Sequence, residues 1–436
     1  MKTMKVALLA TAALAAVSAS ARADDAAAIK AQLEALTARI AQLEAAPSVP
    51  AGYSLLTVSQ GTPIVVPGYE VLRKDALAYG DTATVIGIMP TADMPASTTI
   101  EWSGYARAAI AYSDYSDNND HPDPQPDSYV ADDDGFDVFS RGQLKVVGKT
   151  DTAVGEVGAQ LEIRGNIEGQ RGDDEANERL YFEQYWGWWA MTPELTLGGG
   201  FAGSLANVGY GYDGACNCYY TDNADVYSNP GDTSQMRLTY ASGPLSFAVA
   251  VEDASGSGAS WGDGNDLGVA GEVKYSGDVV SGEVSAVWRG APETASVPWK
   301  DYSLSTTTDT ADFWQVGAGL GFALGDMASI SLAANLGETN YGADFWNVNG
   351  LISANLSDTV HGEVAAGYKE YGTAQGWTGN YDRNIWAVMA GLYYDPVPQL
   401  TIGLEAEYSE LTQNDDGNPD YEQDATTIDL VTVFRF

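Results

Sequence analysis

The dominant pattern of the chain is an alternation of apolar and polar residues with a period of two, which begins near Thr99 and continues to the last residue. The stretch "TIEWSGYARAAIAY" places Trp102 and Ile110 on one face and Glu101 and Arg107 on the other. Successive side chains of a β-strand point to opposite faces. The pattern therefore predicts strands that are apolar on one side and polar on the other.

About sixteen such runs occur, and the connections between them alternate in length. Short ones such as "TDT", "SGP" and "SDT" alternate with long polar ones such as "NIEGQRGDDEAN". The runs begin near residues 99, 136, 153, 178, 194, 233, 244, 267, 279, 312, 328, 344, 359, 382, 399 and 425. We therefore predict an all-β fold, a transmembrane antiparallel β-barrel of about 16 strands over residues 99–436.

A soluble, secreted β-protein is the alternative to a membrane barrel. A sandwich of this length would split into two domains, and no linker divides residues 99–436. Aromatic residues also collect at the predicted strand ends, where a membrane barrel carries its interfacial girdles. These residues are Trp186, Trp188, Trp189, Tyr393, Tyr394, Phe434 and Phe436. Both observations favour the membrane barrel.

The final strand, "IDLVTVFRF", has an apolar face that runs from Ile428 to Phe436 and a second face that carries Asp429 and Arg435. A strand at the end of a chain exposes an unpaired edge, which favours aggregation unless another strand covers it. We expect the apolar face to meet lipid and the strand that begins near Thr99 to pair with this edge. The last strand is thus predicted to close the barrel.

The first residues, "MKTMKVALLATAALAAVSASARA", combine two lysines, an apolar run and an A-x-A cleavage site. This order is typical of a secretory signal peptide, predicted over residues 1–23. No later segment has the run of apolar residues that a membrane-spanning helix needs. We expect Sec-dependent export to the outer membrane of a Gram-negative bacterium.

Residues 24–46 carry apolar residues at alternating spacings of four and three, a heptad pattern that predicts a periplasmic coiled-coil helix. The positions of this seam are Ile29, Leu33, Leu36, Ile40 and Leu43. So short a coiled coil is marginal alone, so we expect it to associate with copies of itself while something larger holds the chains together. The alternative is a single amphipathic helix that lies on its own domain. Residues 47–98 have no sustained periodicity, and two roles stay open for them, a linker or a segment that enters the pore.

The net charge of −39 makes nucleic acid a poor partner, while a hydrophobic content of 45% argues against a disordered acidic chain. Enzymatic activity is not expected, because the two histidines, His121 and His361, fall at opposite ends of the predicted barrel. The C-x-C pair, Cys216 and Cys218, has no nearby histidine or third cysteine, which is a weak metal signal.

The first long loop is rich in aspartates, and hard divalent cations prefer oxygen ligands. Asp132, Asp133 and Asp134 are therefore weak candidates for cation binding, either within the loop or as a bridge to lipopolysaccharide. The alternative is a loop that its charge keeps solvated, and no EF-hand spacing is present. We expect no cofactor.

Four stretches resemble the general porins of alphaproteobacteria: "EWSGYARAAIAYSD", "SRGQLKVVGKTDTAVGEVGAQLEIRGN", "RLYFEQYWGWWAMTPELTLGGGFAGS" and "MRLTYASGPLSFAVAVED". The terminal Phe436, with Phe434, is similar to the barrel-end assembly signal of outer-membrane proteins. The resemblance covers residues 99–436. It implies a trimer of 16-stranded barrels, each a passive aqueous channel in outer-membrane lipid, with the third external loop folded into the lumen.

By this resemblance, the connection from about Gly203 to Asp232 constricts the pore and contributes Asp213, Asp222 and Asp225. The alternation of the strands places four bases on the lumen side, Arg107, Arg141, Lys145 and Arg237. Acids and bases across a narrow pore create a transverse field, in which polar solutes orient while apolar solutes must disturb ordered water. The simpler interpretation is that these are solvated side chains of a polar interior.

The function that this sequence predicts is an outer-membrane porin for passive diffusion of small hydrophilic solutes and ions. The acid excess predicts a mild preference for cations. Two alternatives remain, a substrate-specific outer-membrane channel and a structural tether between the outer membrane and the cell wall.

Overall fold

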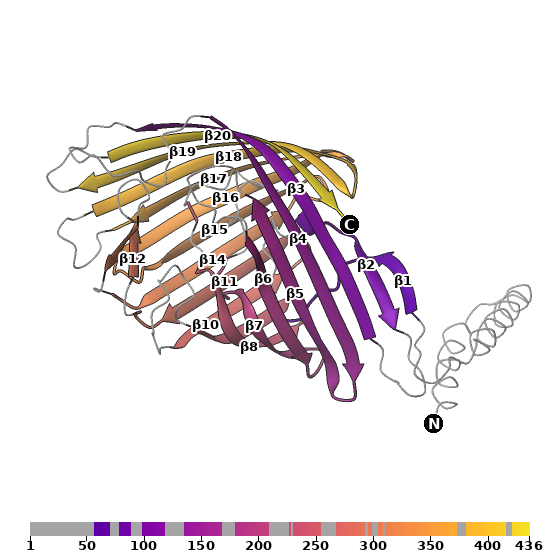
Figure 1. Cartoon of the computed structure of the whole chain (residues 1–436). Helices are drawn as coiled ribbons and strands as arrows, with labels where there is room; N and C mark the ends of the chain where they lie inside the picture. Colours follow the sequence, from indigo (N-terminus) through magenta and orange to yellow (C-terminus); the bar gives the residue numbers. More distant parts are fainter. Residues whose placement is uncertain are drawn as a thin grey trace, which may run out of the picture. The chain divides into compact units, whose positions relative to one another are not determined.

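The structure is a computed structural model of the chain (Figure 1). It describes residues 56–69, 78–88, 98–117, 135–167, 179–208, 226–227, 230–253, 267–292, 295–298, 304–307, 310–372, 381–415 and 421–436. The predicted signal peptide and coiled-coil helix lie outside the described residues. Within them, no helix is both long enough and apolar enough to cross a bilayer.

One large antiparallel sheet of 18 strands makes up the fold, and sixteen of its strands form the barrel. These are β3 (Thr98–Asp117), β4 (Gly135–Thr152), β5 (Gly155–Ile167), β6 (Arg179–Ala190), β7 (Leu195–Gly203), β8 (Asp232–Ser242), β9 (Leu245–Asp253), β10 (Leu267–Ser276), β11 (Val280–Arg289), β14 (Phe313–Ala323), β15 (Ala328–Glu338), β16 (Asp344–Ser357), β17 (Val360–Tyr371), β18 (Tyr381–Val397), β19 (Leu400–Asp415) and β20 (Tyr421–Arg435). Fifteen of them begin within two residues of the predicted position, and β20 begins four residues earlier.

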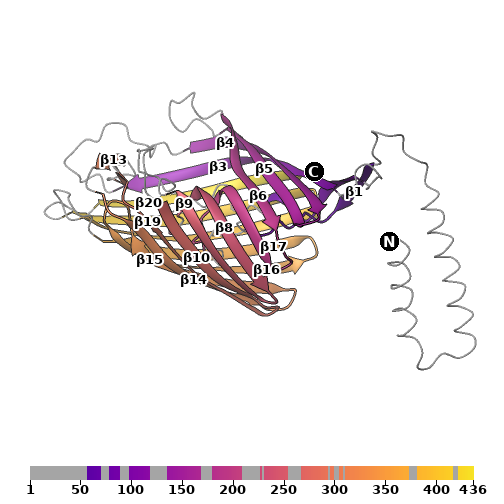
Figure 2. The same cartoon turned by 90° about the horizontal axis from the view of Figure 1, so that it is seen from below.

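The barrel closes because β20 pairs with β3, from Gln423 opposite Asp117 to Arg435 opposite Tyr105. Every other barrel strand pairs with its neighbours in chain order. Figures 1 and 2 show from two directions how the strands wrap around one interior. The prediction that the last strand closes the sheet is confirmed, and no edge of β20 is left for another chain to pair with along this register.

The two faces of β20 differ as the alternation predicted. Leu430, Phe434 and Phe436 point outward and are 50%, 54% and 58% exposed. Asp429 and Val431, which alternate with them, are fully buried on the inner side. The outer surface of the barrel is thus apolar and the inner surface carries the polar groups, which is the arrangement that a bilayer requires.

The last residue is held at the seam. The Phe436 N–H donates to the Gly104 carbonyl at 3.1 Å, beyond the last β20–β3 ladder pair. A Cβ atom on Gly104 would lie 2.6 Å from the Phe436 ring, so only glycine leaves room for the ring at this position. Phe434 and Phe436 lie on the outer face, and their role in assembly stays a prediction.

The two ends of the barrel differ in their connections. One end, called here the short-turn end, carries connections of two to four residues such as 153–154, 243–244 and 358–359. The other, called the long-loop end, carries connections such as 118–134, 204–231 and 254–266. A short hairpin of β12 (Ala295–Pro298) and β13 (Leu304–Thr307) belongs to another long-loop connection and was not predicted.

Two further strands that the sequence did not predict extend the sheet at the short-turn end. They are β1 (Leu56–Gly61) and β2 (Ala83–Ile88), which pair with each other. Strand β2 pairs with Thr98–Trp102 of β3, on the same edge that β20 occupies further along. Figure 1 shows this hairpin beside β3, near the C-terminus of the chain. From Tyr105 onward, β20 occupies the edge of β3 with which β2 pairs before it. The connection between β1 and β2 therefore cannot continue along this edge and has to leave the plane of the sheet.

Some aromatic residues do not lie where the pattern placed them. A register shift between Glu162 and Ile163 in the β5–β6 ladder reverses the faces of β6. Trp186 and Trp188 are therefore buried inside the barrel, at 2% and 3% exposure. Tyr393 is also inside, whereas Trp189 and Tyr394 face outward. The prediction of an interfacial girdle is wrong for the three inward residues.

Candidate functional site in the barrel lumen

The interior of the barrel is strongly charged. Among the described residues, nine acids and seven bases are buried, and all are on inward-facing positions of the strands. The acids are Glu101, Glu162, Glu252, Glu272, Glu283, Glu363, Glu405, Glu407 and Asp429. The bases are Arg107, Lys145, Arg164, Arg237, Arg289, Lys369 and Arg383. Buried charges are costly unless paired or hydrated, so an interior of this kind is suited to contact with water and ions.

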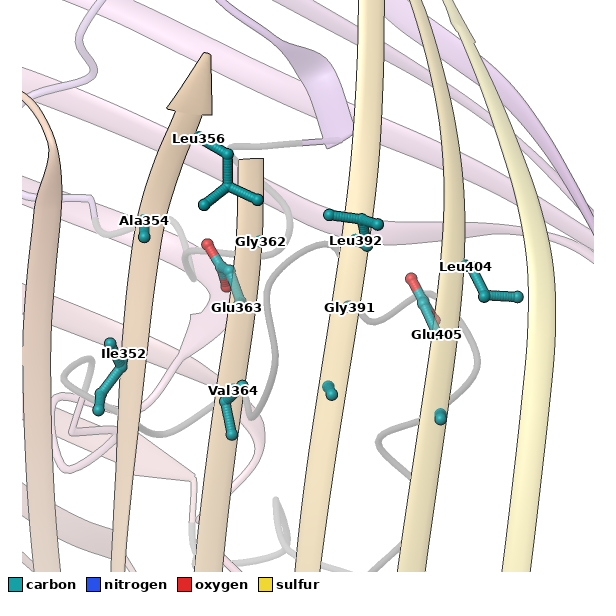
Figure 3. A pocket seen from close by; sticks show the side chains of 12 residues that line it. Ile352, Ala354, Leu356, Gly362, Glu363, Val364, Gly391, Leu392, Leu404 and Glu405 are labelled. Carbon is teal, nitrogen blue, oxygen red and sulfur yellow. The ribbon is translucent and has the colours of Figure 1, made fainter. Parts of the chain in front are cut away.

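Four of the acids gather on β17–β20. Glu363, Gly391, Glu405 and Asp429 are in register across these four strands, and Figure 3 shows the first three on neighbouring strands. Glu407 is the next inward residue of β19. This set of four acids, called here the acid row, gives one sector of the interior a negative potential.

Tyr393 lies beside the acid row. Its hydroxyl donates to Glu405 Oε1 at 3.0 Å, and its ring stacks on His361 with the centroids 5.0 Å apart. A Cβ atom on Gly391 would lie 2.2 Å from the Tyr393 hydroxyl oxygen. Glycine at position 391 therefore allows the tyrosine to lie flat against the wall.

The outer surface over β16–β19 is hollowed, and Figure 3 shows the side chains that line this hollow. This hollow of about 380 Å³ is lined mainly by apolar side chains that point outward, such as Val364, Leu392 and Leu404. Glu363 and Glu405 also border the hollow, but they lie in the strands that form its floor. The alternation of the strands directs their carboxylates inward, away from the hollow. The hollow thus belongs to the lipid side and is separate from the lumen.

A group of bases lies on β3–β5. Arg107 and Arg141 are directly opposite each other in the β3–β4 ladder, and Arg164 lies opposite Gln143 in the next. Arg164 Nε donates to Gln143 Oε1 at 2.8 Å, and its Nη1 forms an ion pair with Glu183. Strands β3 and β20 are neighbours, so the base group and the acid row meet along the seam of the barrel. Basic and acidic side chains thus occupy neighbouring sectors of the lumen wall. The sequence had instead placed the acids on the loop that faces the bases, at positions outside the described residues.

The connection between β7 and β8 is called here loop L3 (residues 204–231), and its described ends lie in the lumen. The structure describes residues 204–208, 226–227 and 230–231 of it. Leu205 and Ala206 pack against inward alanines of β9 and β10, and Val226 packs against Leu351 and Ile385 on the other side. Both described ends of L3 thus lie on the inner wall, in agreement with its predicted course.

Side chains of the wall hold L3 through its backbone carbonyls. The donors are Gln315 Nε2 to Ala206 O (2.9 Å), Asn347 Nδ2 to Val226 O (3.3 Å), Lys369 Nζ to Tyr227 O (2.8 Å) and Arg289 Nη1 to Pro230 O (2.7 Å). Two wall glycines make room for the loop, since a Cβ atom on Gly317 would lie 2.4 Å from Val208 and one on Gly367 2.7 Å from Val226. Sequence reasoning missed these contacts, because glycines and amides on an inward face look like ordinary pore lining.

One ion pair secures both ends of L3. Arg289 Nη2 lies 2.9 Å from Glu252 Oε2, and both side chains are fully buried. Glu252 also accepts from the Ser204 hydroxyl at 2.9 Å, while Arg289 reaches Pro230 O. Ser204 and Pro230 are the first residue of L3 and one of its last, so the pair ties the loop at its entry and its exit.

A second chain segment also occupies the lumen. The connection between β1 and β2, called here the lumen segment (residues 62–82), is described for residues 62–69 and 78–82. Val66 packs against Val147, Trp186 and Trp188 of the inner wall. Ala78 and Tyr79 pack against Tyr105, Ala109, Val431 and Val433. Of the two roles left open for residues 47–98, these contacts favour entry into the pore for the described part.

Polar contacts tie the lumen segment to the charged wall. The Ile64 N–H donates to the Glu101 carboxylate, and the Tyr79 hydroxyl donates to Glu162 Oε2 at 3.0 Å. Burial, reinforced by the charge of Glu162, raises the pKa of Tyr79, so its hydroxyl stays protonated and remains a donor. Lys145 lies 3.6 Å from Glu162, and its ammonium is 5.2 Å from the centre of the Tyr79 ring. Lys145, predicted to line the constriction, is thus covered by the lumen segment.

Arg237 joins the two inserted segments. Its Nη1 donates to Gly68 O of the lumen segment at 3.1 Å, and its Nη2 donates to Gly203 O, just before L3, at 2.8 Å. Its guanidinium also lies 5.2 Å from the centre of the Trp186 ring. The sequence placed Arg237 among the bases that face the loop acids. The structure places it at the point where both segments meet the wall.

Several predicted positions lie outside the described residues. They are Asp213, Asp222 and Asp225 of L3, Asp132, Asp133 and Asp134 of the first long loop, and the seam residues Ile29, Leu33, Leu36, Ile40 and Leu43. Within the described part of the chain, no group of three or more His, Cys, Asp or Glu residues is placed to hold a metal ion. Of the predicted constriction set, the structure places Arg107 and Arg141 opposite each other, whereas Lys145 lies four residues further along β4 and Arg237 lies on β8.

A closed barrel with a charged interior, narrowed by chain segments folded inside it, is the architecture of a membrane channel. The sequence model of a family described as "Porin subfamily" matches residues 94–434. The chain belongs to this porin family. It is thus an outer-membrane porin and a channel, and in such barrels the short turns face the periplasm while the long loops face outward.

Solved structures agree with the porin fold. The outer membrane channel DcaP of Acinetobacter baumannii shares 13% identity, with a TM-score of 0.56 over 78% of this chain and 97% of its own. OmpT of Vibrio cholerae shares 12%, with a TM-score of 0.52 over 78% of this chain and 98% of its own. Likenesses at these identities concern the fold alone. Among curated protein sequences, no relative matches the porin.

Proposed function

We propose that this porin mediates passive diffusion of small hydrophilic solutes and ions across the outer membrane. The observation that carries the proposal is the closed 16-stranded barrel whose inward positions hold charged side chains around L3. Solutes that hydrogen-bond well can exchange water for such a wall, whereas apolar solutes cannot. The base group on β3–β5 and the acid row on β17–β20 occupy neighbouring sectors of the wall, and this uneven distribution of charge supports a field in the passage that orients polar solutes.

We expect the channel to prefer cations mildly, because nine buried acids outnumber seven buried bases and the whole chain carries a net charge of −39. A pore potential of about −1 kT raises the local cation concentration about threefold. In planar bilayers with a KCl gradient, the reversal potential should therefore have the sign of K⁺ preference, and the preference should weaken at high salt. A reversal potential of the Cl⁻ sign at low salt would contradict this expectation.

The assembly that fits the family is a homotrimer in outer-membrane lipid, with lipopolysaccharide around the long loops. The heptad pattern of residues 24–46 supports trimer formation. A short coiled coil is marginal alone, and it gains stability when the barrels hold its helices together. We also propose that the chain is exported through the Sec pathway, that it works without a resident cofactor, and that any divalent cation is held by acidic external loops.

A further inference from the structure

We propose that the lumen segment is a second, fixed constriction of this channel, which narrows it from the short-turn end independently of L3. The proposal rests on the channel function proposed above. A hairpin between β1 and β2 could close with a two-residue turn after the pair Gly61 and Ala83. The chain instead places 21 residues, 62–82, between them. Its described residues, 62–69 and 78–82, lie inside the barrel.

The route of the segment follows from the edge of β3. Strand β2 ends its pairing at Trp102, and Arg435 of β20 pairs with Tyr105 just beyond it. Arg435 Nε donates to Ala78 O at 2.9 Å, so the end of β20 itself holds the returning part of the segment. A Cβ atom on Gly80, whose φ is +74°, would lie 2.8 Å from the Arg435 side chain. This close approach requires glycine and fixes where the segment leaves the wall.

The segment is anchored along its described length, which argues that it stays in the lumen. Val66, Ala78 and Tyr79 are at most 6% exposed, and each packs on inward-facing side chains of the barrel. Leaving the lumen would return these apolar surfaces to water, at about 25 cal/mol for each Å². It would also break the hydrogen bonds from Arg237 to Gly68 and from Arg435 to Ala78.

Val65 shows which side of the segment faces the passage. Its neighbours Ile64 and Val66 contact the wall through Glu101 and Val147, respectively. Val65 itself is 87% exposed, so its side chain points away from that wall. An exposed apolar residue at this level narrows the water-filled path and offers no hydrogen bonds to a hydrated solute.

The segment also changes which charges a solute meets. The Lys145 ammonium lies near the rings of both Tyr79 and Tyr69, 5.2 Å and 5.9 Å from their centres. Glu101 and Glu162 accept hydrogen bonds from the segment. The segment therefore contacts Lys145, Glu101 and Glu162. A solute that passes meets the acid row and the bases Arg107, Arg141 and Arg164 instead.

The first test excises residues 62–82 and joins Gly61 to Ala83 with Asn-Gly, which suits a two-residue hairpin turn. We expect the single-channel conductance to rise about twofold and the size limit for sugars in liposome swelling to increase, because the open cross-section grows. A folded variant with native conductance and native size limit would overturn the proposal. A native protein that conducts nothing would instead contradict the channel function, so the two failures are distinguishable.

A point variant tests the proposal independently, in case the chain without residues 62–82 does not fold. Val65→Trp adds volume on the exposed side of the segment and should lower the conductance by about a third or more. The matched control is Val58→Trp on β1, where the valine is 69% exposed but lies before the segment enters the lumen. The control should conduct like the native porin. Equal effects of the two substitutions, or no effect of Val65→Trp, would count against the constriction.

A cross-link tests whether the constriction is fixed. A Cβ atom on Gly68 would lie 3.6 Å from Thr239 Cβ, within the range that a disulfide bridges. Gly68→Cys with Thr239→Cys, made with Cys216 and Cys218 replaced by serine, should conduct equally when oxidised and when reduced. If oxidation lowered the conductance, the segment would have to leave the lumen in the conducting state, and the proposal of a fixed constriction would be wrong.

Discussion

Replacing Arg289 by methionine should destabilise the barrel by about 3–5 kcal/mol, because it leaves the fully buried Glu252 carboxylate without its cation. The same change removes the donor that holds Pro230 O, and it disturbs the site at which Glu252 holds Ser204. L3 would then lose its hydrogen bond at Pro230 and keep a weakened one at Ser204, while the bonds from Gln315, Asn347 and Lys369 would remain. On gels, the variant should lose its compact folded form at a lower temperature than the native porin. In planar bilayers, its conductance steps should be larger and noisier than those of the native porin.

The double variant Glu252→Met with Arg289→Met separates the two effects. Removing both charges avoids a buried unpaired carboxylate, so most of the thermal stability should return. The hydrogen bonds from Arg289 to Pro230 and from Ser204 to Glu252 would still be missing, so the noisy conductance should persist. If Arg289→Met alone left both the thermal transition and the conductance unchanged, the ion pair would not be what holds L3.

Neutralising the acid row should reverse the ion preference of the channel. Glu363→Gln, Glu405→Gln, Glu407→Gln and Asp429→Asn together leave five buried acids against seven buried bases among the described residues. The potential of the interior should change sign with this balance, since these side chains lie in a confined space with low-dielectric walls. In a KCl gradient, the reversal potential should move from the K⁺ sign to the Cl⁻ sign.

The matched control removes the same number of charges at the short turns. Glu194→Gln, Asp278→Asn, Asp326→Asn and Asp358→Asn lie on exposed positions at the barrel end. Solvent and salt screen such charges, so the reversal potential should shift only slightly. A shift in the control as large as that of the acid-row variant would show that overall charge, and not the lumen wall, sets the preference.

The barrel could be predicted from the sequence because its main determinant is local. Alternation with a period of two identifies each strand, and turn residues mark where it ends. The closing strand was predictable because Asp429 and Phe434 fall on opposite faces of "IDLVTVFRF". Where a register shift breaks the period, as opposite Glu162 and Ile163, the prediction of an interfacial position failed for Trp186 and Trp188, which point inward.

The lumen segment could not be recognised in this way, because nothing periodic marks it. Its inward apolar residues, such as Val66 and Tyr79, are spaced by contacts with the wall and not by a regular strand or helix. Alternation showed that Lys145 and Arg237 face inward, but not that another part of the chain covers them. One signal was available. The short alternating runs "LTVSQG" and "ATVIGI" flank residues 62–82 and indicate a hairpin whose connection is far too long for a turn.

The central claim is that this porin forms a water-filled channel whose width two inserted segments limit. Single-channel recording of the purified native protein in planar bilayers tests it most directly. We expect large, ohmic conductance steps that occur in groups of three, as separate pores of one trimer would give. The absence of any conductance from folded, membrane-inserted protein would contradict the account.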